Sequence, residues 1–243
     1  MTKLVIDFGN TLTKAGFYDS DVLTDLYTSE QLALDTLKEF IIKHLPVKAA
    51  IISSVIHYPD EIREYLKRNF TFIELDEHTP IPLKNLYQTP ETLGKDRLAA
   101  VVATNQLFKN QNALVINAGT CITYDLVNHT NEYTGGAISP GINIRFKALH
   151  TFTDKLPLIE NRMPPEMVGK TTEECIRSGV LNGVLAEMDG MIDFFRSHYT
   201  DLKIILSGGD AKYFDNRLKN STFARPNIVL TGLNIILDHY LEK

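Results

Sequence analysis

Residues 114–125 read LVINAGTCITYD, and residues 4–15 read LVIDFGNTLTKA, so the chain carries one short motif twice. The two copies align at a constant offset of 110 residues, which pairs Gly9 with Gly119. Each copy is an apolar run that ends in a glycine turn and continues into a second run with strand character, which predicts a hairpin. Because self-similarity at a fixed offset indicates repeated architecture, we expect two related halves.

The composition narrows the class of protein. The 243 residues include 44% hydrophobic and 23% charged residues, which is typical of a globular protein with a large core. A net charge of −5 gives no basic field for nucleic acid or an anionic membrane surface, so we expect neither as a partner. Cys121 and Cys175 are too few for a disulfide framework or a four-thiolate metal site. With no signal peptide or membrane span visible, we expect a cytoplasmic protein.

Strand and helix patterns alternate along the chain, which predicts α/β architecture with paired domains and mixed sheets. The polar segment 109–112 separates the halves, so the expected domains are 1–110 and 111–243. The first is expected to hold a hairpin over 3–18, a helix within 32–41, a strand over 49–55 and helices over 60–69 and 97–108. The second is expected to hold strands over 113–117, 121–128, 132–138 and 203–207, a helix over 172–197 and a last helix after Thr231. Residues 78–92 carry three prolines and no periodicity, which predicts a long, functional or disordered loop.

The glycine turn of the first copy has the residues of a phosphate site. Asp7 ends the strand and Gly9 lets the chain turn, which leaves backbone N–H groups available to an anion. We expect those donors on Gly9, Asn10 and Thr11. A carboxylate at the rim can hold Mg²⁺, as phosphoryl transfer requires. A plain Asx turn between two strands is the alternative interpretation of so short a motif.

Two further glycine turns favour a nucleotide. The second copy of the motif supplies NAGT at 117–120, and LSGGDA at 206–211 reads as a strand, a glycine turn and a helix. Glycine turns that face each other across a cleft between related halves suit a nucleotide polyphosphate. The residues alone therefore predict a phosphotransferase with a nucleotide cleft.

The order of six sequence blocks resembles one family of kinases. The blocks are DFGNT, YQTPETLGKDR, INAGTCITYD, GGAISPG, GKTTEECIRSG and SGGD, and they span nearly the whole chain. This order is similar to that of the type III pantothenate kinases, also called the Bvg accessory factor family, to which LGKDR and GGAISPG are specific. The resemblance implies the acetate and sugar kinase, Hsp70 and actin superfold, in which two ribonuclease-H-like halves bind ATP, and it implies a homodimer. The implied reaction is ATP-dependent phosphorylation of pantothenate to 4′-phosphopantothenate, the first step of coenzyme A biosynthesis.

The resemblance assigns site residues motif by motif. It implies that ATP binds at Asp7, Phe8, Gly9, Asn10, Thr11, Leu12, Thr13, Lys14, Thr120, Gly208 and Gly209, with Mg²⁺ on Asp7. It implies that pantothenate binds at Tyr87, Gly94, Lys95, Asp96, Arg97 and Thr172. Asp96 matches the family's general base, which accepts the proton of the attacking hydroxyl and orients that group. The alternative explanation for an aspartate at position 96 is structural, because a carboxylate in the first turn of a helix interacts favourably with the helix dipole.

Three of these residues have structural alternatives. Arg97 can bind the carboxylate of pantothenate through its guanidinium fork, or it can be a solvated helix charge. Tyr87 is either a substrate tyrosine or a packing anchor of its loop. Thr172 matches the threonine that reaches the substrate from the other subunit of the dimer, whereas Thr171 and Glu174 fit a capping box for the following helix.

Asn117 departs from the family pattern. Most members have Asp at this position, and that carboxylate holds the K⁺ or NH₄⁺ that many of them require. An amide oxygen still coordinates K⁺, but the site lacks the Coulomb attraction of a carboxylate. We therefore expect this chain to depend less on a monovalent cation than its relatives do.

Two other functions stay open. The same fold can serve a different ligand, as in a sugar or acyl kinase or a polyphosphate hydrolase, although the intact LGKDR block argues against that. The chain can instead be a regulatory or assembly module that binds nucleotide without catalysis, although the intact Asp7 and Asp96 argue against that. One coupled assay with ATP and pantothenate separates the three functions.

Overall fold

The chain divides into two compact units. The computed structural model describes residues 1–160 and 162–243. Unit 1 contains residues 1–110, 127–135 and 227–243, and unit 2 contains residues 111–126 and 136–226. The last helix of the chain therefore belongs to unit 1. The domain bounds expected from the sequence, 1–110 and 111–243, stay a prediction.

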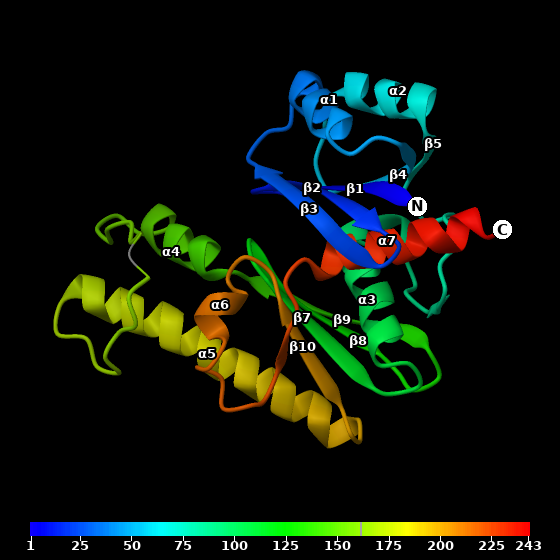
Figure 1. Cartoon of the computed structure of the whole chain (residues 1–243). Helices are drawn as coiled ribbons and strands as arrows, with labels where there is room; N and C mark the ends of the chain where they lie inside the picture. Colours follow the sequence, from blue (N-terminus) through cyan, green and yellow to red (C-terminus); the bar gives the residue numbers. More distant parts are fainter. Residues whose placement is uncertain (161) are drawn as a thin grey trace. The chain divides into compact units, whose positions relative to one another are not determined.

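Unit 1 is built on a five-stranded sheet with helices on both faces (Figure 1). Its strands are β1 (Thr2–Phe8), β2 (Thr13–Asp19), β3 (Val22–Ser29), β4 (Val47–Ser54) and β5 (Thr71–Glu74), in the order β3-β2-β1-β4-β5. Its helices are α1 (Leu34–Ile42), α2 (Asp60–Asn69), α3 (Lys95–Leu107) and α7 (Ile228–Leu241). Strand β1 is antiparallel to β2 and parallel to β4, so the predicted hairpin over 3–18 is confirmed.

Alternation along β1 decides which side chains face which helices. Leu4, Ile6 and Phe8 belong to the core cluster that contains the buried residues of α1 and α2. On the other face, the buried Lys3 forms an ion pair with Asp238 of α7 at 2.5 Å. Asp7 is an even number of residues along the strand from Lys3, so its side chain points to the same face, which α3 and α7 cover.

Helices α3 and α7 pack tightly on that face. A Cβ added at Gly232 of α7 would overlap the backbone carbonyl of Ala99 of α3. Only a glycine permits two helix backbones to approach so closely. This contact fixes the place of α3, whose N-terminal turn carries the LGKDR block, on the face of the sheet to which Asp7 points.

The second sheet has the order β11-β10-β7-β8-β9-β6. Its strands are β6 (Lys84–Asn85), β7 (Ala113–Ala118), β8 (Cys121–Val127), β9 (Glu132–Pro140), β10 (Lys203–Ser207) and β11 (Phe223–Ala224). The helices of unit 2 are α4 (Ile142–Thr151), α5 (Thr172–His198) and α6 (Ala211–Phe214). Figure 1 shows α5 running along one face of this sheet, and its buried residues Leu181 and Met188 share a core cluster with Leu114 and Ile116 of β7.

The strand orders confirm the duplication that the repeated motif predicts. The order β9-β8-β7-β10-β11 repeats β3-β2-β1-β4-β5 strand for strand, and β6 is an addition next to β9. The register repeats as well, since Asp7 lies opposite Ser53 on the parallel strand β4 and Asn117 lies opposite Ser207 on β10. The fold is therefore mixed α/β with two related sheets.

Several elements differ from the sequence expectation. Helix α3 begins at Lys95 and α7 begins at Ile228, earlier than expected, and the expected loop over 78–92 contains β6 and a 3₁₀ turn over Pro90–Thr92. Strand β3 was not expected because its sequence, VLTDLYTS, places apolar residues in adjacent pairs and so lacks the alternation that marks a half-buried strand. Among the described residues, no helix is both long enough and apolar enough to span a membrane.

Candidate active site

Three polar side chains form a row across the first sheet. Asp7 on β1 lies opposite Lys14 on β2 and opposite Ser53 on β4. Residues in register on neighbouring strands point to the same face, so the three side chains are neighbours. The hydroxyl of Ser53, which is fully buried, donates a hydrogen bond to Asp7 Oδ1 at 3.1 Å.

The surroundings of the Asp7 carboxyl group disfavour its charged form. Burial and, as a smaller effect, the nearby charge of Asp96 raise its pKa from 3.8 to about 7, against the opposing effects of Ser53 and Lys14. Burial also lowers the pKa of Lys14, although Asp7 opposes that change. Two carboxylates in a partly buried place repel each other unless a cation neutralises them.

This arrangement of donors fits Mg²⁺. In the described residues, no cluster of three histidine, cysteine, aspartate or glutamate side chains could enclose a metal ion. Mg²⁺ does not need such a cage, because it is usually held by one or two carboxylates together with substrate phosphates. Asp7 is a carboxylate whose charge is poorly compensated by the protein, as a ligand of that kind would be.

Asp96 lies in the first turn of α3, where the N-terminal end of the helix favours a negative charge. Gly94 forms the N-cap, and a Cβ added there would lie 2.7 Å from Asp96 Oδ1. The absence of a side chain at Gly94 therefore leaves room for the observed position of the Asp96 carboxylate. The neighbouring Lys95 forms an ion pair with Glu77 at 3.3 Å.

The turn after β1 differs from the expected cradle in one donor. The N–H of Gly9 donates to the carbonyl oxygen of Leu12 at 3.2 Å, so it closes the turn and is not available to an anion. The side chains of Asn10, Thr11 and Leu12 are exposed at the tip of the hairpin. Beyond the turn, Lys14 Nζ donates to Asn227 Oδ1 at 2.9 Å, next to the start of α7.

Arg97 lies beside an aromatic pair in unit 1. It is only 5% exposed, so the alternative interpretation as a solvated helix charge is wrong. Its guanidinium carbon lies 5.6 Å from the ring centroid of Tyr87, within cation–π range. The Tyr87 ring stacks on Tyr133, with centroids 5.9 Å apart and planes 7° apart. Tyr133 was missed from the sequence because a tyrosine in a strand carries no local sign of its partner.

In unit 2 the three other glycine motifs pack against one another. Gly208 has a φ of +96°, and a Cβ there would overlap the carbonyl of Ala118. The N–H of Asp210 donates to the same carbonyl at 2.9 Å. The N–H of Gly141 donates to Thr120 O at 3.0 Å. The NAGT, SGGD and SPG segments thus form one group, with Thr120 exposed on it.

The start of α5 confirms the capping box. The hydroxyl oxygen of Thr171 accepts a hydrogen bond from Glu174 N at 3.2 Å, and the Glu174 carboxylate accepts one from Thr171 N at 3.1 Å. Thr172 is the next residue, and its side chain is exposed. The cap therefore uses Thr171 and leaves Thr172 for another role.

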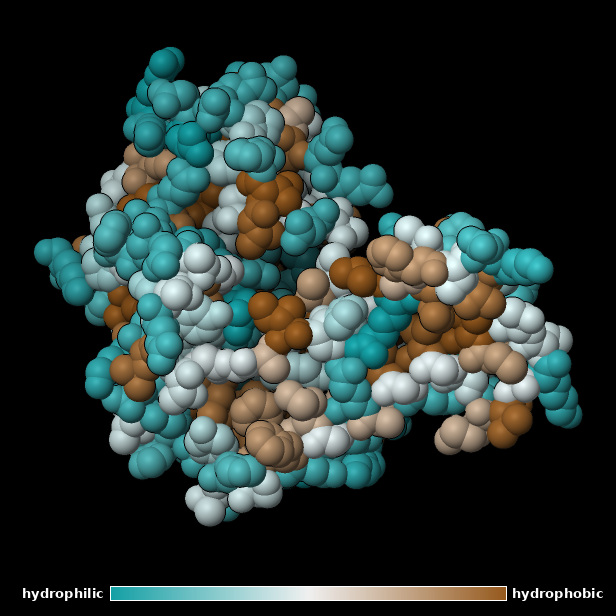
Figure 2. All heavy atoms as spheres, turned by 180° about the vertical axis from the view of Figure 1, so that it is seen from behind, coloured by the Kyte–Doolittle hydropathy of each residue, from teal (hydrophilic) through white to brown (hydrophobic). Residues whose placement is uncertain are grey.

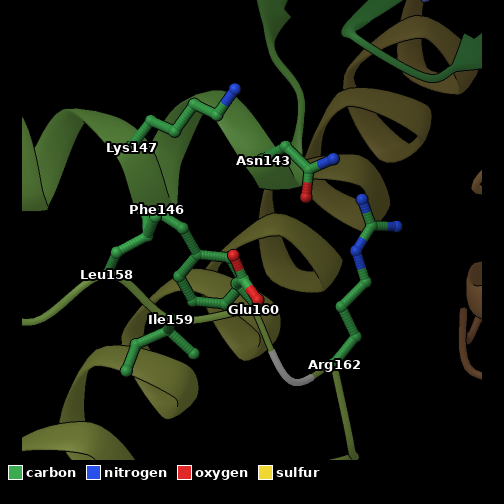
Figure 3. Close-up of a pocket in the computed structure, with 7 residues that line it drawn as sticks. All are labelled: Asn143, Phe146, Lys147, Leu158, Ile159, Glu160 and Arg162. Carbon is green, nitrogen blue, oxygen red and sulfur yellow. The ribbon is translucent and has the colours of Figure 1, made fainter.

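Two cavities lie away from these residues. One of about 330 Å³ in unit 2 lies between α4 and residues 158–160 and 162, where Asn143 and Arg162 point toward one another (Figure 3). The other, of about 460 Å³ in unit 1, lies beside the Lys3–Asp238 ion pair at the start of β1. Neither is lined by a residue that the sequence assigns to ATP or pantothenate, so side-chain chemistry rather than cavity size defines the candidate site.

Comparison with known sequences points to one family. The family model described as type III pantothenate kinase matches residues 3–193. A type III pantothenate kinase of Phocaeicola vulgatus is 45% identical over 237 residues, which cover 97% of this chain and 98% of that relative.

Comparison with solved structures supports the fold. Component A of the (R)-2-hydroxyglutaryl-CoA dehydratase of Acidaminococcus fermentans matches with a TM-score of 0.57 at 12% identity, over 100% of both chains. The inorganic polyphosphate/ATP-glucomannokinase of Arthrobacter sp. strain KM matches with a TM-score of 0.51 at 12% identity, over 100% of this chain and 99% of that one. The chain therefore has the superfold that sugar kinases share with actin and Hsp70, as the sequence predicts.

Proposed function

The chain belongs to the type III pantothenate kinase family, and from that premise we propose that Asp96 and Asp7 form the centre that moves a phosphoryl group from ATP to pantothenate. The enzyme is a kinase that phosphorylates pantothenate in coenzyme A biosynthesis, with ATP and a divalent cation. The observation that carries the assignment is the proximity of the two carboxylates, one at the end of β1 and one in the first turn of α3.

Asp96 orients the acceptor hydroxyl and takes its proton. The N-terminal end of α3 favours a negative charge at Asp96, which suits a group that accepts a proton during attack on the γ-phosphorus. In phosphoryl transfer most of the catalytic effect comes from positioning and charge stabilisation, so orienting the hydroxyl is the larger part of this role.

Asp7 is the ligand for Mg²⁺, which supplies charge neutralisation to the phosphates when it is bound. Ser53 fixes one oxygen of this carboxylate, and Lys14 lies on its other side in the sheet. In our proposal the turn from Phe8 to Thr13, together with Lys14, contacts ATP. Thr120, Gly208 and Gly209 contact it from the packed glycine motifs.

Pantothenate binds through Arg97 and Tyr87 in this proposal. Arg97 carries a planar fork of N–H donors, the geometry that binds a carboxylate in two places, and pantothenate ends in a carboxylate. Gly94 and Lys95 complete the acceptor side next to Asp96. The aromatic ring of Tyr87 would cover the apolar part of the substrate.

A homodimer would bring Thr172 to the site of the neighbouring subunit. Its exposed position directly after the cap of α5 suits such a contact. The preceding segment exposes apolar side chains, with Met167 77% and Val168 74% accessible. In Figure 2 apolar surface, shown in brown, gathers over α4 and α5. Exposed apolar surface of this kind marks an interaction site.

The monovalent cation site is weak in this proposal. Asn117 is half-buried at the end of β7 and offers an amide oxygen where a carboxylate would attract K⁺ or NH₄⁺. The register match with Asp7 shows that the position is equivalent in the two halves.

A coupled assay of ADP release with ATP, Mg²⁺ and pantothenate tests the function. We expect pantothenate-dependent turnover, and loss of about a thousand-fold in kcat for Asp96→Asn with a melting temperature no lower than that of the wild type. Turnover with hexoses but not with pantothenate would instead favour a sugar kinase. Nucleotide binding without turnover on any acceptor would favour a regulatory module.

A further inference from the structure

We propose that Tyr133 is a positioning residue for the acceptor substrate, because its stacked ring holds Tyr87 against Arg97. This inference rests on the proposed function, in which Tyr87 and Arg97 bind pantothenate. Tyr133 is fully buried and would not touch the substrate itself. Its effect would pass through the ring of Tyr87.

The backbone next to Tyr87 is attached to the strand that carries Tyr133. Leu86 N donates to Tyr133 O at 2.9 Å, and Lys84 N donates to Asn131 O at 3.1 Å. These bonds make the short strand β6 parallel to β9. The loop that carries Tyr87 is therefore held at its middle by a pair of strands, although it is irregular on either side.

An ion pair strengthens the same attachment. Lys84 Nζ lies 2.8 Å from Glu132 Oε1. Hydrogen bonds from Lys84, Asn128 and Thr130 lower the pKa of Glu132 to about 2, so the carboxylate stays ionised across the working pH range. The bonds to β9 set the position of the Tyr87 backbone and leave the direction of its side chain to be set by what its ring touches.

Three residues of unit 1 lie next to the ring of Tyr87. Tyr133 stacks on it in parallel, and the guanidinium of Arg97 lies within cation–π range. Gly135 completes the surroundings, since a Cβ there would lie 3.7 Å from Tyr87 Cδ2 and its φ of +102° favours glycine. Of these neighbours, Tyr133 is the large rigid surface that fixes the plane of the ring.

Loss of the stack should therefore change acceptor binding and little else. Aromatic pairs contribute enough beyond simple burial to change an equilibrium by about three- to ten-fold. We expect Tyr133→Leu to raise KM for pantothenate by about that factor, with KM for ATP unchanged. Tyr133→Phe keeps the ring and should leave both constants within about two-fold.

A double-mutant cycle is the decisive test. If Tyr133 acts through Tyr87, Tyr133→Leu should raise KM for pantothenate in the wild type but not in a Tyr87→Leu background. Tyr18→Leu is the matched control, because Tyr18 is a tyrosine 1% exposed on β2 of the same unit and its hydroxyl lies 3.3 Å from Thr231 Oγ1 of α7. We expect this control to lower the melting temperature without a selective change in KM for pantothenate.

Three results would overturn the inference: independent effects in the cycle, an equal rise of both KM values, or a Phe variant as impaired as the Leu variant. If the Leu variant does not fold, Tyr133→Met supplies a flexible apolar side chain without the ring and is judged by the same criteria. Turnover of the wild type distinguishes failure of the positioning role from failure of the proposed function. An active wild type with an unselective Tyr133 variant refutes only the positioning role, whereas a wild type inactive on pantothenate refutes the proposed function and this inference with it.

Discussion

Asp96 lies close enough to Asp7 for its negative charge to raise the pKa of the Asp7 carboxyl, in addition to the larger effect of burial. The two residues come from distant parts of the chain, one from the end of β1 and the other from the first turn of α3. Their mutual repulsion destabilises the protein without a cation, and the same repulsion favours the binding of one. The pair therefore lowers the stability of the metal-free protein while it favours binding of the cation that the reaction requires.

The first prediction concerns pH and the stability of the metal-free protein. The folded-state pKa of Asp7, about 7, lies above its ordinary value of 3.8. The proton that Asp7 retains therefore stabilises the fold fully below pH 3.8, and this stabilisation is lost as pH rises through about 7. Asp7→Asn cannot ionise, so in EDTA it should exceed the wild type in free energy of unfolding by roughly 2 kcal/mol at pH 8.

Denaturant unfolding at pH 5 and pH 8 measures this difference. The gain of Asp7→Asn should be much smaller at pH 5 than at pH 8. Asp96→Asn serves as the matched variant, since it removes the neighbouring charge and should give a smaller gain with the same sign. A gain that is equal at both pH values would contradict the assigned titration.

The second prediction concerns Gly94. A methyl group there would push on the carboxylate of Asp96, while the backbone of Gly94, with φ of −56° and ψ of 126°, accepts any residue. Gly94→Ala should therefore keep the melting temperature and lower kcat by about ten-fold or more. Gly183→Ala is the control, because Gly183 lies in α5 with open space around it and its replacement should slightly stabilise the helix. An active Gly94→Ala enzyme would show that the position of the carboxylate is not critical.

The third prediction separates the two glycines of the SGGD turn. Gly208 has a positive φ and no room for a Cβ, so Gly208→Ala should cost about 3 kcal/mol or more in free energy of unfolding. Gly209 has nothing within 4 Å of an added Cβ, so Gly209→Ala should fold normally. If Gly209 contacts ATP, its variant should raise KM for ATP. Thermal melts and initial-rate kinetics on both variants give the comparison.

The sequence predicted best the features that local patterns determine, namely single helices and the repeated strand units. The helix over 60–69 matches α2 residue for residue, and the repeated motif led to two sheets of the same strand order. Prediction was weaker where tertiary contacts decide the outcome. The burial of Arg97 and the stack of Tyr133 on Tyr87 depend on segments far apart in the chain, and no local pattern encodes them. The hydrogen bond that removes the N–H of Gly9 from the expected cradle depends on the detailed turn geometry.

The fourth prediction concerns the monovalent cation. With Asn117 in place of a carboxylate, turnover should be nearly the same in KCl as in choline chloride at equal ionic strength. Asn117→Asp should restore the Coulomb attraction and produce a stimulation by K⁺. A strong stimulation of the wild type by K⁺ would refute the prediction that its cation site is weak. An Asn117→Asp variant that K⁺ does not stimulate would show that the cation does not bind at this position.

The last prediction separates two adjacent threonines. Thr171 caps α5 through its side chain, so Thr171→Ala should lower the free energy of unfolding by about 1 kcal/mol. Thr172 is exposed and takes no part in the cap, so Thr172→Ala should leave stability unchanged. If Thr172 reaches the site of a neighbouring subunit, its variant should raise KM for pantothenate while the enzyme stays dimeric. Mixing Thr172→Ala with Asp96→Asn sharpens the test, because a heterodimer of the two would hold one site with both native residues and one site with neither. The heterodimers should contribute active sites with wild-type KM beside the raised KM of the Thr172→Ala homodimers, whereas a threonine that acts within its own subunit would leave every active site with the raised KM.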